Sequence, residues 1–210
     1  MSTTLDHEVA DLKRRLDEAL VERDEAEAQK AAMAEVLEII NASPDQLAPA
    51  FDAILERAVK LSDAAFGVLW TYDGERLNRA ALLGAPKAYA DYLGNSISIT
   101  ESAVYADIVS GETFVHVADL TESEPYRARN EFRQATVDLG KAKTGLAVPL
   151  RRGKDLLGIF AVFRREARPF AETQITLVRN FAAQAVIAIE NTSLRGLVVS
   201  SVEGHRALGY

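Results

Sequence analysis

The chain has 210 residues and a net charge of −7; 48% of its residues are hydrophobic and 26% charged, which is typical of one folded domain with an accessory element. The acidic balance opposes nucleic-acid binding, and the absence of cysteine excludes disulfides, thiolate nucleophiles, cysteine zinc sites and thioether-linked chromophores. No apolar run approaches the roughly 20 residues of a membrane-spanning helix, so we predict a cytoplasmic protein with no membrane partner.

Residues 1–42 are predicted to form a long helix that pairs with a second copy as a parallel coiled coil. Apolar and small residues recur in steps of four and three from Leu5 to Ile40, with no proline or glycine among them. This period keeps one seam facing a partner helix, although Arg23 and Lys30 weaken its middle. The alternative is a helix folded back on its own domain. The predicted dimer contacts are Leu5, Leu12, Leu16, Met33, Leu37 and Ile40.

A change of period marks the start of a domain. Ser43-Pro44 ends the first helix and begins a second one over residues 45–61. Alternating side chains then predict strands over 66–72 and 76–83, joined by a two-residue Asp73-Gly74 turn. Shorter elements follow: a helix at 87–93, a strand at 96–100, a helix at 102–110, a strand at 113–117, a loop over 119–130 and a helix at 128–139.

Two strands and a long helix complete the pattern. Strands are predicted at 146–150 and 156–163, and the second is apolar on both faces, so it should lie at the centre of a sheet. The closing helix, 172–194, carries two apolar stripes, one to cover the sheet and one for another partner. Residues 196–210 are predicted to be a tail or a truncated linker that does not continue this helix. The stripe with heptad spacing, predicted as a second dimer seam, is Ile175, Val178, Ala182, Ala185 and Ile189.

Two sets of residues carry a family resemblance. In the C-terminal half these are residues 144–150, Gly153, 157–162, Arg168-Pro169-Phe170 and 181–191, and upstream they are residues 65–69, 72–74, 84–86 and Tyr89. On these residues, the segment 43–195 resembles a GAF domain. The sequence is most similar to GAF domains of bacterial sensor histidine kinases and some nucleotide cyclases, in which a coiled coil precedes the domain. The resemblance implies an α+β, PAS-related fold: a central antiparallel sheet of about six strands, with dimer-forming helices on one face and a small-molecule pocket under capping loops on the other.

A few side chains are candidates for lining that pocket. Tyr126, Arg127, Arg129, Arg133 and Lys141 crowd the segment where the resemblance places the lid, and arginines beside an aromatic ring suit an anionic or planar ligand. The alternative is an ordinary solvated loop. Core packing is the alternative for the remaining candidates. The candidate pocket as a whole comprises Trp70, Tyr72, His116, Tyr126, Arg129 and Arg133, and no cofactor is identified.

Catalytic and metal-binding patterns are missing from the sequence. The three histidines are far apart, no phosphate-binding loop is present, and Asn130-Glu131-Phe132-Arg133 only superficially resembles the signature of cyclic-nucleotide-binding GAF domains. We therefore predict a non-catalytic sensory module of a two-component signalling protein, with a kinase or cyclase effector missing from the chain or supplied in trans. The alternatives are a purely structural dimerisation or adaptor domain and, more distantly, a small-molecule enzyme using His116 or a carboxylate.

Overall fold

The computed structural model describes residues 13–16, 19–20, 23–24, 27, 30–31, 34, 47–99 and 105–206, with the backbone alone over 192–206. The chain divides into two units, Met1–Glu35 and Val36–Tyr210. In the first unit the described residues are helical and exposed, Leu16 by 58%. The other predicted seam residues lie outside the described residues, so the coiled coil stays a prediction.

The second unit is built on a six-stranded antiparallel sheet in the order β3-β2-β1-β6-β5-β4. As expected from its two apolar faces, β6 lies at the centre, between β1 and β5. The predicted α+β fold with about six antiparallel strands is confirmed. The strand bounds are Phe66–Tyr72 for β1, Arg76–Leu83 for β2, Ser96–Ser98 for β3, Val115–Val117 for β4, Thr144–Arg152 for β5 and Asp155–Arg164 for β6.

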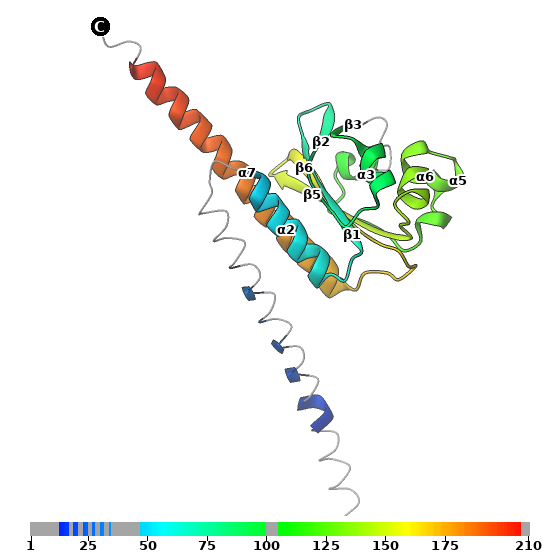
Figure 1. The fold of residues 1–210 in the computed structure, drawn as a ribbon. Helices are drawn as coiled ribbons and strands as arrows, with labels where there is room; N and C mark the ends of the chain where they lie inside the picture. Colours follow the sequence, from blue (N-terminus) through cyan, green and yellow to red (C-terminus); the bar gives the residue numbers. More distant parts are fainter. Residues whose placement is uncertain are drawn as a thin grey trace, which may run out of the picture. The chain divides into compact units, whose positions relative to one another are not determined.

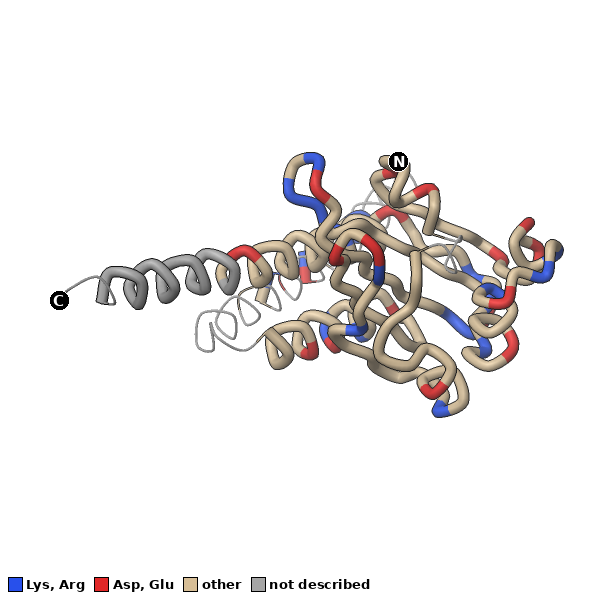
Figure 2. The backbone as a smooth tube through the Cα atoms, turned by 90° about the horizontal axis from the view of Figure 1, so that it is seen from above, with Lys and Arg blue, Asp and Glu red and all other residues tan. Residues whose placement is uncertain are grey.

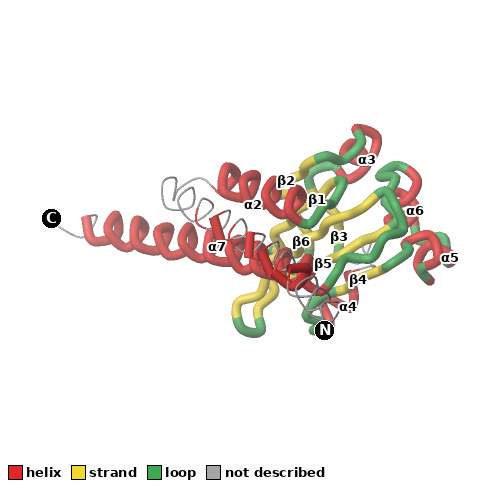
Figure 3. The backbone as a smooth tube through the Cα atoms, turned by 90° about the horizontal axis from the view of Figure 1, so that it is seen from below, coloured by secondary structure: helices red, strands yellow, loops and turns green. Residues whose placement is uncertain are grey.

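Helices cover both faces of this sheet. Helices α2 (Leu47–Leu61) and α7 (Glu172–Arg206) lie side by side along one face (Figure 1). The opposite face carries a lid of α3 (Lys87–Leu93), α4 (Ala106–Ser110), the 3-10 turn η2 (Leu120–Glu122), α5 (Glu124–Arg127) and α6 (Glu131–Asp138), and α3, α5 and α6 are seen beyond the strands in Figure 3. Side chains of β1 alternate between the two faces of the sheet. Phe66, Val68 and Trp70 face the lid, whereas a Cβ on Gly67 would meet Leu55 of α2 on the other face.

The predicted strand bounds 66–72 and 76–83 are confirmed, but the two-residue turn between them is shifted by one position: Tyr72 pairs with Leu77 and the Asp73 N–H donates to the Arg76 oxygen, so the turn residues are Gly74 and Glu75. The Asp73 carboxylate accepts hydrogen bonds from the backbone N–H groups of Arg76 and Glu75 and from the Asn78 side chain, which lower its pKa to about 2. Two further local predictions are wrong. The segment predicted as a loop over 119–130 contains η2 and α5. The closing helix does not end near 194 but continues to Arg206.

Gly158 allows the two central strands to approach each other. A Cβ at this position would lie 2.0 Å from the Trp70 backbone oxygen, so any larger residue would push β6 away from β1. The glycine also pairs with Leu150, where the β5–β6 register becomes irregular. The backbone of β6 at Gly158 therefore lies in close contact with the backbone of Trp70.

A single buried arginine joins the ends of the two sheet-covering helices. Arg164, at the end of β6, is 2% exposed and its guanidinium stacks 4.1 Å from the centre of the Phe170 ring. Each of its five N–H groups donates one hydrogen bond, at 2.8 to 3.1 Å, so the cation is fully satisfied. The acceptors are the backbone oxygens of Ser62, Asp63, Arg168 and Pro169 and Oε1 of Gln174 in α7.

Candidate functional site

A small cavity lies between the lid and the β4–β5 edge of the sheet. Its volume is about 20 Å³, enough for about one water molecule. Apolar side chains from the strands form its floor, and α6 contributes three residues from one helical face. The lining consists of Tyr105, Val115, Val117, Leu120, Phe132, Arg133, Thr136, Gly145, Leu146, Ala147 and Phe163.

The cation in this lining, Arg133, is buried without a counter-charge among the described residues. Its side chain is 7% exposed, and its Nε has no hydrogen-bond partner. Burial lowers the pKa of Arg133, and the groups that oppose this shift are the phenols of Tyr105 and Tyr89, not carboxylates. Removing a guanidinium from water is costly unless it is paired, so this group is the least satisfied feature of the cavity.

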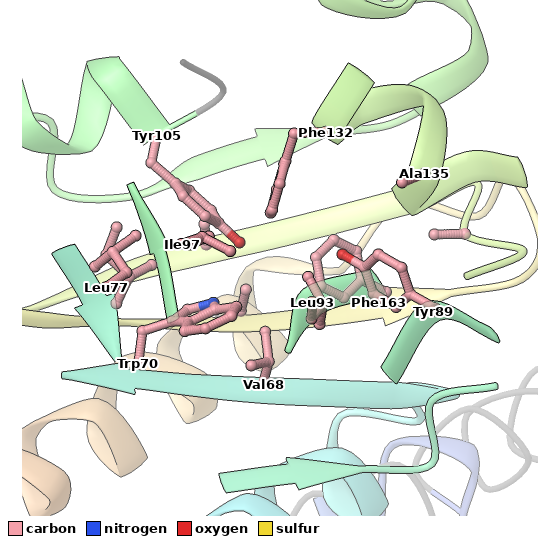
Figure 4. Packing of buried hydrophobic residues seen from close by; sticks show 14 of the residues in the cluster. Val68, Trp70, Leu77, Tyr89, Leu93, Ile97, Tyr105, Phe132, Ala135 and Phe163 are labelled. Carbon is pink, nitrogen blue, oxygen red and sulfur yellow. The ribbon is translucent and has the colours of Figure 1, made fainter. Parts of the chain in front are cut away.

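Two aromatic side chains from opposite layers meet beside the cavity. The Trp70 indole of β1 and the Tyr105 ring of the lid point into the same space (Figure 4). Trp70 is fully buried, and its indole N–H lies near the Tyr105 hydroxyl without reaching hydrogen-bond geometry. Burial raises the pKa of Tyr105 to about 12, so the phenol stays protonated at neutral pH.

One buried hydroxyl pair joins two helices of the lid, α3 and α6. Thr136 Oγ1 donates to the Phe132 backbone oxygen at 2.8 Å, so its single proton is used. The Tyr89 hydroxyl, 3.1 Å from Thr136 Oγ1, is therefore the donor between α3 and α6. Burial strongly raises the pKa of Tyr89. The cavity roof is thus positioned by residues that the sequence places 47 apart.

The six predicted pocket residues lie in four different places. The structure brings Arg133 to the cavity, with Trp70 beside it. Tyr72 donates a hydrogen bond to the Gly74 oxygen in the β1–β2 connection. Tyr126 donates to Asp138 on the outside of the lid, and the Asp138 charge raises its pKa. Arg129 is exposed, as are Arg127 and Lys141.

His116, the remaining candidate, lies on the other side of the sheet from the cavity. Its neighbours Val115 and Val117 line the cavity, so strand alternation turns His116 away. Its Nε2 accepts a hydrogen bond from the Phe170 N–H at 3.1 Å, just before α7 begins. Partial burial and then the nearby Arg164 charge lower the pKa of His116, whereas Glu172 acts in the opposite direction.

This arrangement predicts a pH effect on stability. The folded-state pKa of His116 lies below the value of 6.5 expected for the unfolded chain, so the unfolded state binds more protons as the pH falls. We expect stability from this group to be complete above about pH 6.5 and to decrease below it, as Nε2 stops accepting from Phe170. Urea unfolding between about pH 7.5 and about pH 5.5 should show a smaller pH dependence for His116→Gln than for the original chain. Equal slopes would contradict this assignment.

Sequence reasoning missed Tyr105, Thr136 and the two cavity-facing valines of β4. A partial signal existed, because Phe132, Arg133 and Thr136 have the spacing of one helical face. No comparable signal marks Tyr105, whose place in the cavity depends on how the lid folds over the sheet.

The described surface gives little indication of other chemistry. Acidic and basic residues are interspersed along the described backbone (Figure 2). Within the described residues no group of histidine and acidic side chains is suited to a metal ion. None of the described helices combines the length and the hydrophobicity needed to span a bilayer.

The comparisons with known proteins give one family. The GAF domain family matches residues 45–190 of the chain, whereas no curated protein sequence matches. The GAF domain of a phosphoenolpyruvate-protein phosphotransferase from Coxiella burnetii is similar, with a TM-score of 0.66 at 18% identity over 82% of this chain and 98% of that one. A GAF domain/HD domain protein from Geobacter sulfurreducens gives 0.63 at 14% identity, over 73% and 97%. A domain of a sensor histidine kinase protein from Sinorhizobium meliloti gives 0.54 at 17% identity, over 67% and 88%.

Proposed function

The chain belongs to the GAF domain family, and on that basis we propose that it is a regulatory sensory module, not itself catalytic, that binds a small molecule between sheet and lid. The observation that carries this proposal is the small cavity beside two buried donors without partners, Arg133 Nε and Trp70 Nε1. Buried polar groups are normally satisfied, so unpartnered ones beside a cavity favour a ligand site. Similar structures come from a sensor histidine kinase and a methyl-accepting chemotaxis protein, which supports a signalling role of the two-component type.

One strand offers a route from the cavity to the output helix. Gly145, Leu146 and Ala147 of β5 line the cavity, and β5 also packs against α7. A ligand that fits one arrangement of β5 better than another would bias the position of α7 by its difference in affinity. We propose that a kinase or cyclase effector reads this change.

The module is proposed to act as a parallel homodimer. Both apolar stripes of α7 face the protein's own interior: Ile175, Val178, Ala182 and Ala185 of the predicted seam are buried within the chain. A different, exposed row also has steps of three and four, and it ends in Ile187, which is 37% exposed. The apolar end of this row, Ala183 and Ile187, is where we propose that α7 pairs with the same helix of a second copy. The members of the row are Thr173, Thr176, Asn180, Ala183 and Ile187.

Native mass spectrometry tests ligand and dimer together. We expect freshly purified protein to be a dimer carrying extra mass that is lost on denaturation. Ala183→Glu combined with Ile187→Glu should weaken the dimer and raise the fraction of monomer, because like charges would face each other across the α7 row while only the predicted coiled coil would still hold the copies together. Val109→Glu, at an exposed apolar position of α4, is the matched control and should remain dimeric. A monomeric original chain would contradict the dimer, and a bare dimer would contradict stable ligand retention.

A purely structural adaptor is the second candidate function. The observation in its favour is the small cavity volume of about 20 Å³, which means that side chains almost fill the site. An adaptor of this kind would dimerise normally, and no small molecule would change the thermal midpoint of its unfolding. The sensory proposal differs because it requires a ligand that accepts hydrogen bonds from Arg133 Nε and Trp70 Nε1.

A further inference from the structure

We propose that the cavity takes a small monocarboxylate with an apolar body, and that Arg133 binds its carboxylate group. This inference rests on the proposed sensory function and identifies the chemical class of the ligand. Three features of the site support it: its uncompensated positive charge, its excess of hydrogen-bond donors over acceptors, and the groove that leads to it.

The charge of the site is positive and uncompensated among the described residues. Arg133 is more than nine-tenths buried and lines the cavity, and its Nε has no partner. The groups that oppose the lowering of its pKa are phenols, which carry no charge at physiological pH and so do not neutralise the cation. An anion entering the cavity would gain a charge-assisted hydrogen bond from a guanidinium that is already desolvated.

The hydrogen-bonding groups of the site also favour an anionic ligand. Both unpartnered buried atoms on this side of the sheet, Arg133 Nε and Trp70 Nε1, carry protons and cannot accept. Thr136 already donates its proton to the Phe132 oxygen. The missing partner must therefore supply acceptors, and an ionised carboxylate is acceptor-only.

The rest of the lining selects against a heavily charged or large ligand. Val115, Val117, Leu120, Phe132 and Phe163 surround a single cation, so one negative charge and an apolar body match the site. A dianionic phosphate would leave charge uncompensated against these side chains, and a neutral ligand of the same shape would leave the guanidinium unpaired.

Phe132 provides a way in. It lines the small cavity and also a larger groove of about 490 Å³ that runs between α3, β3 and the start of α6. The residue lies in the first turn of α6, where the Asn130 side chain caps the helix by accepting from the Arg133 backbone N–H. Rotation of the Phe132 ring would join groove and cavity and make room for the body of the ligand.

Benzoate is a suitable probe, because it combines one carboxylate with an apolar ring, and benzyl alcohol is its neutral counterpart. Trp70 is the only tryptophan of the chain, so its fluorescence reports on the site. We expect benzoate to change this fluorescence saturably and to raise the unfolding temperature. Benzyl alcohol should bind about tenfold or more weakly, and so should benzoate to Arg133→Met and Arg133→Gln, because each change removes one charge-assisted contact. Arg127→Met, an exposed lid arginine, is the matched control and should bind benzoate normally.

Several results would overturn the inference. Benzoate binding that survives both Arg133 substitutions, equal binding of benzyl alcohol, tighter binding of inorganic phosphate, or no binding of benzoate would each do so. Native mass spectrometry separates this failure from failure of the sensory function. A neutral co-purified compound would refute only the carboxylate, whereas a bare dimer that binds none of the probes would refute both.

Discussion

Replacing Arg164 by leucine is expected to lower the free energy of unfolding by about 3–5 kcal/mol, because it removes all five hydrogen bonds of a buried guanidinium at once. Leucine cannot donate a hydrogen bond, so the four backbone oxygens and the Gln174 Oε1 that accept from Arg164 lose this donor. The stacking on Phe170 is lost as well. Urea unfolding followed by Trp70 fluorescence, at one fixed protein concentration, measures the change.

An exposed arginine in the neighbouring strand provides the control. Arg152 of β5 is exposed and pairs weakly with Asp155 at 3.6 Å. Arg152→Leu should change stability by no more than about 0.5 kcal/mol. If Arg164→Leu were also within about 1 kcal/mol of the original chain, the Arg164 network would not be what joins α2 to α7.

Replacing Arg133 by methionine should instead raise the free energy of unfolding. We expect the ligand-free protein to gain about 1–3 kcal/mol, because an unpaired buried cation is replaced by an apolar side chain of similar length. Protein refolded from denaturant, and so stripped of bound molecules, should be used for the urea measurement. The gain should disappear when a saturating ligand stabilises the original chain, since binding adds to the stability of the folded state.

Arg127→Met separates this effect from a general response to lost charge. Arg127 lies in the lid but is exposed, so its substitution should leave stability within about 0.5 kcal/mol. A clear loss of stability in Arg133→Met would mean that the guanidinium is already well paired in the ligand-free protein. The two buried arginines therefore form a contrasting pair: Arg164 is satisfied in every donor, and Arg133 is not.

The fold could be predicted largely from local patterns. The period of two produces β1, β2, β5 and β6, and the doubly apolar β6 was correctly predicted to be central. Periodicity is weakest where elements are short, which explains why η2 and α5 were taken for a loop. The glycine-containing stretch after Arg195 was predicted not to be helical, yet helix α7 includes both Gly196 and Gly204. Glycine lowers helix propensity without forbidding the helix.

The site was less predictable, because burial is decided by contacts that are distant in sequence. Arg133 and Arg129 look alike in the sequence, but only Arg133 is brought under the lid, on the side of α6 that Tyr89 holds through Thr136. His116 was expected beside the pocket, and its strand position turns it to the other face. Composition can indicate an arginine-rich segment, whereas the helix face and the tertiary contacts decide which arginine loses its water.

The unbroken helix α7 has a mechanical consequence. It advances about 1.5 Å and turns about 100° per residue, so its 35 residues extend for roughly 50 Å while keeping a fixed angular relation between the two ends. A small roll of the segment seated on β5 would reach Arg206 as the same angle, because no hinge intervenes to absorb it. Helix α7 would therefore transmit a rotation from the sheet to its C-terminal end without changing the size of that rotation.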